Sequence, residues 1–92
     1  MRALTGTERV IATQNALSTT AEKIASISAG RHRIVVKNID PSITVYLGGD
    51  SSVTSSTGFQ VLAGESFPVY SKGEVYAIAA SGTPTVCIWD ED

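Results

Sequence analysis

Apolar and polar residues alternate from residue 31 to residue 47, with the period of two that is typical of half-buried β-strands. Within residues 31–38, Ile34 and Val36 fall on one face and basic residues fall on the other. Residues 43–47 repeat the alternation after a turn that contains proline. The pattern therefore predicts two strands that are joined as a β-hairpin.

Two consecutive glycines follow the second of these strands. Gly48 and Gly49 have the form of a tight hairpin loop in which both residues would take a positive φ. Residues 50–58 are mostly polar, so we expect an exposed loop there and expect Val53 within it to contribute little to stability.

Four further short runs have strand character and are separated by turn residues. The run at 66–70 contains Pro68, which has no backbone N–H to donate and therefore belongs on the edge of a sheet. Residues 74–80 are apolar on both faces, as expected of a central strand. Runs at 59–62 and 85–89 complete the set.

The first thirty residues carry a weaker pattern. We expect either two short strands, roughly at 8–14 and 23–26, or an extended arm that becomes ordered on a partner. The chain thus divides into an N-terminal segment, 1–30, and a β-domain, 31–92. Seven or eight short strands predict an all-β fold, either a small antiparallel β-sandwich (jelly-roll or immunoglobulin-like) or a barrel. Its expected core includes Ile34, Val36, Val45, Leu47, Tyr76 and Ile78.

The composition suits a surface that docks on another protein. Ser and Thr make up 21 of the 92 residues, whereas only 17% are charged, against about 25% in typical soluble domains. Hydroxyl groups cost less free energy to desolvate than charges do, so such a surface can be buried against a partner at low cost.

The two parts of the chain have opposite net charge. Residues 1–37 hold six basic and two acidic residues, a net charge of +4, and residues 38–92 hold one basic and seven acidic residues, a net charge of −6. The parts either neutralise each other as paired strands or steer neighbouring subunits together. An acidic chain without a basic run gives no reason to expect nucleic-acid binding, and no apolar run is long enough to predict a membrane span or a signal peptide.

Residues that could perform catalysis are few. His32 is the only histidine and has no nucleophile to activate, and one His with one Cys cannot form a zinc site. Cys87 lies between apolar residues and is expected to be a buried, inert thiol. We therefore expect no enzyme, metal or cofactor. The aromatic residues are expected in the core, and exposure of Trp89 and Tyr70 would instead favour a carbohydrate-binding or receptor-binding module.

Four motifs mark the β-domain: V-Y-L-G-G at 45–49, T-S-S-T-G-F at 54–59, A-G-E-S at 63–66 and Y-A-I-A-A-S-G-T at 76–83. In these motifs and in the basic strand before them, the chain resembles small virion proteins of tailed bacteriophages. The resemblance implies a β-sandwich on the outer surface of the phage head, where a decoration (cement) protein binds the major capsid protein as a homotrimer or other closed homo-oligomer. Similar domains occur in head fibres, head-to-tail connectors and tail parts, so these alternatives stay open.

The expected contacts with the capsid or a neighbouring subunit lie in two places, the N-terminal segment and the hydroxyl-rich stretch around residues 51–59. They are Arg9, Asp50, Ser52, Thr54, Thr57 and Phe59. Neither nucleic acid nor membrane is expected as a partner, and synthesis is expected in the cytoplasm of the bacterial host.

Overall fold

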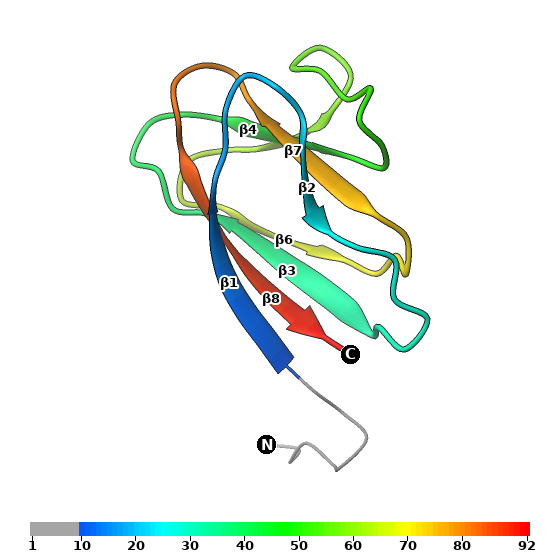
Figure 1. The fold of residues 1–92 in the computed structure, drawn as a ribbon. Helices are drawn as coiled ribbons and strands as arrows, with labels where there is room; N and C mark the ends of the chain where they lie inside the picture. Colours follow the sequence, from blue (N-terminus) through cyan, green and yellow to red (C-terminus); the bar gives the residue numbers. More distant parts are fainter. Residues whose placement is uncertain (1–9) are drawn as a thin grey trace.

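The computed structural model describes residues 10–92, which fold into two antiparallel four-stranded sheets packed face to face (Figure 1). Sheet A has the strand order β1-β8-β3-β6, and sheet B has the order β2-β7-β4-β5. The strands are β1 (Val10–Ala16), β2 (Glu22–Ala25), β3 (Arg33–Asn38), β4 (Val45–Gly48), β5 (Phe59–Val61), β6 (Ser66–Val69), β7 (Val75–Ala79) and β8 (Thr85–Glu91). The expected all-β sandwich is confirmed.

The strand order is that of a jelly roll. Only β4 and β5 are consecutive strands that pair with each other, and every other connection between described strands crosses from one sheet to the other. Two four-stranded sheets wound in this way form two Greek keys around one core. Among the folds that the sequence left open, the jelly roll is the one observed.

Inward-facing side chains of both sheets form a single core. Its members are Leu17, Ala25, Ile34, Val36, Val45, Leu47, Val61, Val75, Ala77, Ala79, Val86 and Ile88. Of the six expected core residues, Ile34, Val36, Val45, Leu47 and Ile78 are buried. The sixth, Tyr76, is only half-buried. It lies opposite Gly48 of β4, on the outer face of sheet B, because the neighbouring residues of β7 point inward.

The predicted hairpin between the strands at 31–38 and 43–47 is wrong. β3 belongs to sheet A and β4 to sheet B, so the turn between them crosses the sandwich. Alternation within each strand tells which side chains are buried, but it carries no information about which strand lies alongside. The expectation for Pro68 is confirmed, since β6 is an edge strand of sheet A.

The two strands expected near the N-terminus are present within the sandwich. β1 pairs with β8 along its whole length and extends two residues beyond the expected end at residue 14, and β2 pairs with β7. The strand alternative therefore holds for residues 10–25, and the arm alternative does not. Residues 1–9, including Arg9, lie outside the described part of the chain.

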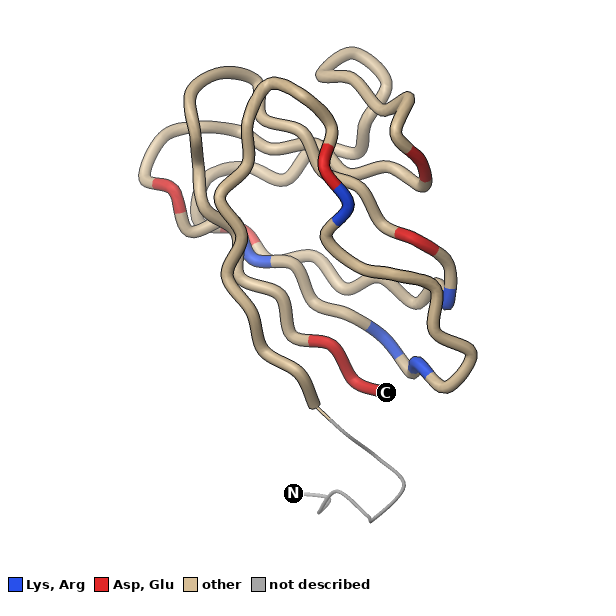
Figure 2. The backbone as a smooth tube through the Cα atoms, viewed as in Figure 1, with Lys and Arg blue, Asp and Glu red and all other residues tan. Residues whose placement is uncertain are grey.

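Within residues 10–92, three ion pairs join basic residues of the first part of the chain to acidic residues of the last part. Figure 2 shows where the basic and acidic residues lie along the backbone. The nitrogen–oxygen distances are 3.5 Å for Lys23 with Glu74, 3.2 Å for Arg31 with Asp90 and 3.1 Å for Arg33 with Glu91. For these residues, the opposite charges of the two parts neutralise each other inside one molecule.

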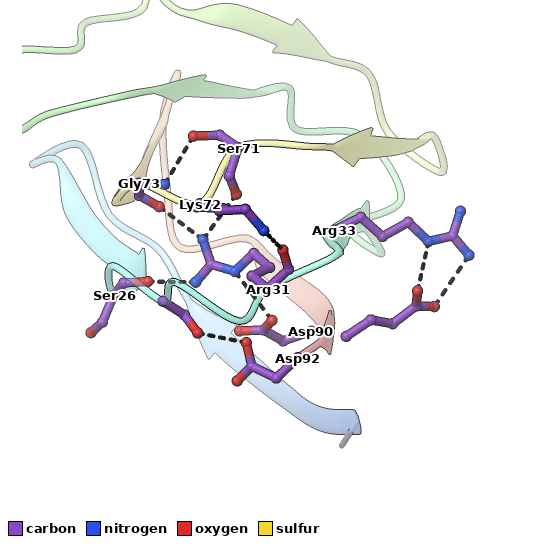
Figure 3. Close-up of polar contacts among 10 residues, drawn as sticks. Ser26, Arg31, Arg33, Ser71, Lys72, Gly73, Asp90 and Asp92 are labelled. Atoms are coloured by element: carbon purple, nitrogen blue, oxygen red, sulfur yellow. Dashed lines mark hydrogen bonds and ion pairs between the residues drawn. The ribbon is translucent and has the colours of Figure 1, made fainter. Parts of the chain in front are cut away.

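The guanidinium of Arg31 is buried and joins three segments at one end of the sandwich (Figure 3). Its Nε donates to Asp90 of β8 at 3.2 Å, and its Nη1 donates to the carbonyl oxygens of Ser71 at 3.2 Å and Gly73 at 2.8 Å. Nη2 donates to the carbonyl oxygen of Ser26. We call these five residues the Arg31 knot. Alternation alone would place Arg31 on the solvent side, but β3 begins at Arg33, so residue 31 does not follow the pleat.

Asn38 performs a similar function at the opposite end. Its buried side-chain amide donates to the carbonyl oxygens of Ile43 at 2.8 Å and Val61 at 3.1 Å, while its Oδ1 accepts from the N–H of Asp40 at 3.1 Å. The side chain thereby links the end of β3 in sheet A to β5 and the start of β4 in sheet B. Each end of the sandwich is therefore held by one buried polar side chain whose hydrogen bonds are satisfied.

Replacing Arg31 by Met should lower the free energy of unfolding by about 3–5 kcal/mol, because it leaves Asp90 and three carbonyl oxygens without their donor. Urea denaturation measures this change. The matched control is Lys23→Met, which removes an exposed ion pair and should cost under about 1 kcal/mol. Equal losses in the two variants would show that the buried network contributes no more than a surface pair.

Candidate functional site

Five of the six expected contact residues lie on the β4–β5 hairpin. Asp50, Ser52, Thr54 and Thr57 are exposed on its loop, residues 49–58, which we call the hydroxyl loop, and Phe59 begins β5. The structure therefore brings these five residues together on one hairpin. The sixth lies outside the described residues.

Val53 anchors the hydroxyl loop to the sandwich. Its side chain is buried and packs against Gly48 and Gly58, at the two ends of the loop. A Cβ atom on Gly48 would lie 2.6 Å from the Cβ of Val53, and one on Gly58 would lie 2.6 Å from the Cβ of Tyr46. The expectation that Val53 is exposed and unimportant is therefore wrong, because the loop curls back over its own strands.

The predicted tight turn at Gly48 and Gly49 is also wrong. Neither residue has a positive φ, and within residues 10–92 the glycines that do are Gly64 and Gly82. Gly48 is needed because Val53 approaches it closely, whereas the position of a Cβ on Gly49 is open space. The two glycines thus matter through close packing at Gly48 and not through a positive φ at both positions.

Hydrogen bonds within the hydroxyl loop hold its first half. Oδ1 of Asp50 accepts from the backbone N–H of Ser52 at 2.9 Å and from the hydroxyl of the same residue. Both bonds favour the ionised carboxylate, and the hydroxyl contributes most to lowering the pKa of Asp50 below its ordinary value of 3.8. The Asp50 carboxylate therefore holds the start of the loop in place through its two hydrogen bonds with Ser52.

A second set of hydrogen bonds holds the other half. Oγ1 of Thr57 accepts from the N–H of Thr54 at 3.0 Å, and Oγ1 of Thr54 accepts from the N–H of Ser56 at 3.2 Å. The carbonyl oxygen of Thr54 accepts from the N–H of Gly58 at 2.8 Å. The loop is therefore ordered before it meets a partner, which reduces the entropy lost on binding.

An apolar hollow adjoins the hydroxyl loop. Phe59 is 53% exposed and stacks on Phe67 of β6, with ring centroids 4.2 Å apart, so the two rings join the outer strands of both sheets. The hollow beside them has a volume of about 280 Å³ and shares Gly48 and Gly49 with the loop. It is lined by Leu47, Gly48, Gly49, Phe59, Phe67, Val69, Ser71, Glu74 and Val75.

Aromatic side chains are also exposed elsewhere, against expectation. Trp89 of β8 is 46% exposed and Tyr70, just after β6, is 70% exposed. Alternation along β8 points Val86 and Ile88 into the core, so Cys87 and Trp89 face outward from sheet A. Cys87 is accordingly half-buried and not fully buried. A second apolar hollow, of about 430 Å³, lies on this outer face.

Charged groups flank the exposed tryptophan. Arg33 donates to Glu91 through Nε at 3.1 Å and through Nη2 at 3.2 Å, and Nε1 of Trp89 donates to Oε2 of Glu91 at 2.8 Å. The hydrogen bonds from Arg33 are the main cause that lowers the pKa of Glu91, and the same pair raises the pKa of Arg33. Strand alternation in residues 85–91 is the signal that could have placed Trp89 on this outer face.

Within residues 10–92, no three His, Cys, Asp or Glu side chains gather as a metal site would require. The side chain of His32 is exposed just before β3. No helix capable of spanning a membrane is found in the same part of the chain.

No known protein family, curated protein or solved structure matches this chain. Its function must therefore be inferred from its own residues.

Replacing Gly48 by Ala should destabilise the protein by about 1–3 kcal/mol, because the new methyl group overlaps Val53. The control Gly49→Ala adds a methyl group in open space at a residue without positive φ, and it should change stability by under about 0.5 kcal/mol. Thermal unfolding compares the two variants. A Gly49→Ala variant that is as unstable as Gly48→Ala would contradict this account of the loop.

Replacing Ser52 by Ala should raise the pKa of Asp50 toward 3.8, since the hydroxyl donor is lost while the backbone donor remains. A carboxyl-carbon NMR titration reports this pKa directly, and Ser51→Ala is the matched control. The pKa of Asp50 is lower in the folded state than in the unfolded state. The stabilisation from its hydrogen bonds with Ser52 is therefore fully present above about pH 3.8, and it is lost as the pH falls through the pKa of the folded state. An unchanged pKa in Ser52→Ala would rule out the hydroxyl as its cause.

Proposed function

We propose that this protein is a bacteriophage structural protein, a capsid decoration (cement) protein that binds the outside of the assembled head and stabilises it. The hydroxyl loop and Phe59 form its contact with the major capsid protein. A trimer or another closed homo-oligomer is part of this proposal, because closed rings on a symmetric shell multiply weak contacts.

The observation that carries the proposal is the pairing of an ordered loop, in which Asp50 is the only charged residue, with an exposed aromatic ring. Residues 51–58 contain six Ser and Thr and no charge, and Val53 together with the internal hydrogen bonds holds their shape. Burying such a surface loses little conformational entropy and leaves no ion without a partner. Phe59 supplies the apolar anchor that a small interface needs at its centre.

Binding of this kind stabilises a shell by mass action. A protein that contacts neighbouring capsid subunits binds the assembled shell and has no complete site on free subunits, so occupancy favours assembly. Binding of this kind requires only a surface that is complementary to the shell, and it requires no reactive group. Jelly rolls occur in viral capsid and lectin domains, which supports the proposal by analogy of fold alone.

Replacing Phe59 by Ser should weaken binding to decoration-free heads at least about tenfold, the effect of removing an interface anchor. Co-sedimentation of the protein with heads and with tails measures binding and also separates a head protein from a connector or tail component. Leu62→Ser is the matched control, because Leu62 is another exposed apolar side chain, beyond the opposite end of β5. Failure of the unaltered protein to bind any phage particle would overturn the proposed function.

A second candidate function is carbohydrate binding on the outer face of sheet A. The exposed Trp89 and Tyr70 meet the condition that this alternative requires. An exposed indole can stack on the apolar face of a sugar ring, and the Arg33–Glu91 pair beside it offers donors and acceptors for hydroxyl groups. The two candidate functions use different faces and can be tested separately.

Titrating neutral oligosaccharides should change the fluorescence of Trp89, the only tryptophan in the chain, if this face binds sugar. Trp89→Ala should abolish sugar binding measured by calorimetry, whereas Phe59→Ser should leave it unchanged. The absence of any fluorescence change or heat with a panel of bacterial surface glycans would remove the second candidate.

A further inference from the structure

The four outer strands of the two sheets differ in how well they are protected against pairing with another strand. β6 contains Pro68, and β5 has only three residues. β2 has four residues, begins with Glu22 and Lys23, and has an irregular register between Lys23 and Ala25. Proline, shortness, charge and irregular register all block edge-to-edge pairing. Three of the four edges in residues 10–92 are therefore protected.

β1 has none of these devices. It is seven residues long, contains no proline, glycine or charge, and pairs with β8 in unbroken register. In an antiparallel edge strand, alternate residues point their N–H and C=O groups away from the sheet. β1 thus presents backbone donors and acceptors along roughly 23 Å, and no other described strand pairs with that side.

Apolar side chains beside β1 are incompletely covered. The side of the sandwich between β1 and β2 has a hollow of about 390 Å³, whereas Phe59 and Phe67 stack across the side between β5 and β6. Ile11 of β1 is exposed, and Ile27 in the β2–β3 connection is 72% exposed. The isoleucines that line the hollow are Ile11, Ile24, Ile27 and Ile88. A strand added to β1 would extend sheet A on this side and shield part of this apolar surface.

We propose that β1 pairs antiparallel with β1 of a second copy of this chain, around a two-fold axis at Thr13. In this register Thr13 faces Thr13 of the partner subunit, a favourable cross-strand pair, and Ala12 faces Gln14 of the partner subunit. The edge is self-complementary because no charged residue meets its own copy. Such a contact closes after two molecules, which selects a dimer among the closed homo-oligomers and not the trimer expected from the sequence.

The dimer should be weak in solution. Strand pairing buries a small area compared with the roughly 800 Å² per partner of a standard stable interface. The fraction of dimer should therefore depend on protein concentration. β1 carries no charge, so it has no group that would recognise a charged strand of another protein. A second copy of β1, which is equally uncharged, fits this edge better. Dimerisation does not require the capsid, so it can fail while the proposed function stands.

Opposite charges at residue 13 test the register directly. Thr13→Lys and Thr13→Glu each place two like charges at the two-fold axis, and each should weaken dimerisation about fivefold, the upper end for a cross-strand charge pair. Thr13 is exposed, so both variants should keep the circular dichroism spectrum of the unaltered protein. An equimolar mixture of the two variants should restore the dimer, which a merely misfolded variant could not do. Thr83→Lys, at an exposed residue in the β7–β8 loop, is the control.

Sedimentation velocity of the full chain between about 10 μM and 1 mM gives the masses, with 9.6 kDa for the monomer. Amide hydrogen exchange should also show protection at alternate residues of β1 that grows with concentration. A monomer throughout this range, a trimer, or a dimer that both Thr13 variants leave intact would each overturn the proposal. Restoration by the mixture, with no effect of Thr83→Lys, would support it.

Discussion

Burial of the Arg31 guanidinium is the interaction on which the rest of the structure depends. A buried cation is tolerated only when its donors are satisfied, and here one carboxylate and three carbonyl oxygens accept from it. The acceptors come from the β2–β3 connection, the β6–β7 connection and β8 (Figure 3). Because these segments are distant from one another in sequence, the Arg31 knot holds one end of both sheets together.

The same knot positions the candidate docking surface. Ser71 and Gly73, whose carbonyl oxygens Arg31 binds, precede Glu74 and Val75, which line the hollow beside Phe59. One wall of the hollow is thus built on a segment that the guanidinium fixes. The hollow adjoins the hydroxyl loop at Gly49, and that loop is ordered by Val53 and by its own hydrogen bonds. The hollow and the loop are therefore shaped before a partner arrives, as low-entropy binding requires.

Three different surfaces lie on one jelly roll. The hydroxyl loop with Phe59 lies at the β4–β5 hairpin, the exposed Trp89 lies on the outer face of sheet A, and the unprotected edge belongs to β1. Each offers a different kind of contact: a shaped, hydroxyl-rich surface, an aromatic platform and a row of backbone hydrogen-bonding groups. The Trp89 surface adjoins β1, because Trp89 pairs with Ala12 and residues 12–14 line the hollow beside it, whereas the hydroxyl loop belongs to sheet B.

The sequence alone determined the all-β class, the approximate strands, the edge position of Pro68 and four core residues, Ile34, Val36, Val45 and Leu47, because these follow from alternation and from the missing N–H of proline. It also placed four of the six proposed contact residues in one exposed polar loop. Only the tertiary structure decided that β3 and β4 lie in different sheets, that Val53 is buried and that Arg31 is enclosed. These features depend on segments far apart in the chain, and a local pattern of polarity carries no information about which distant segments meet.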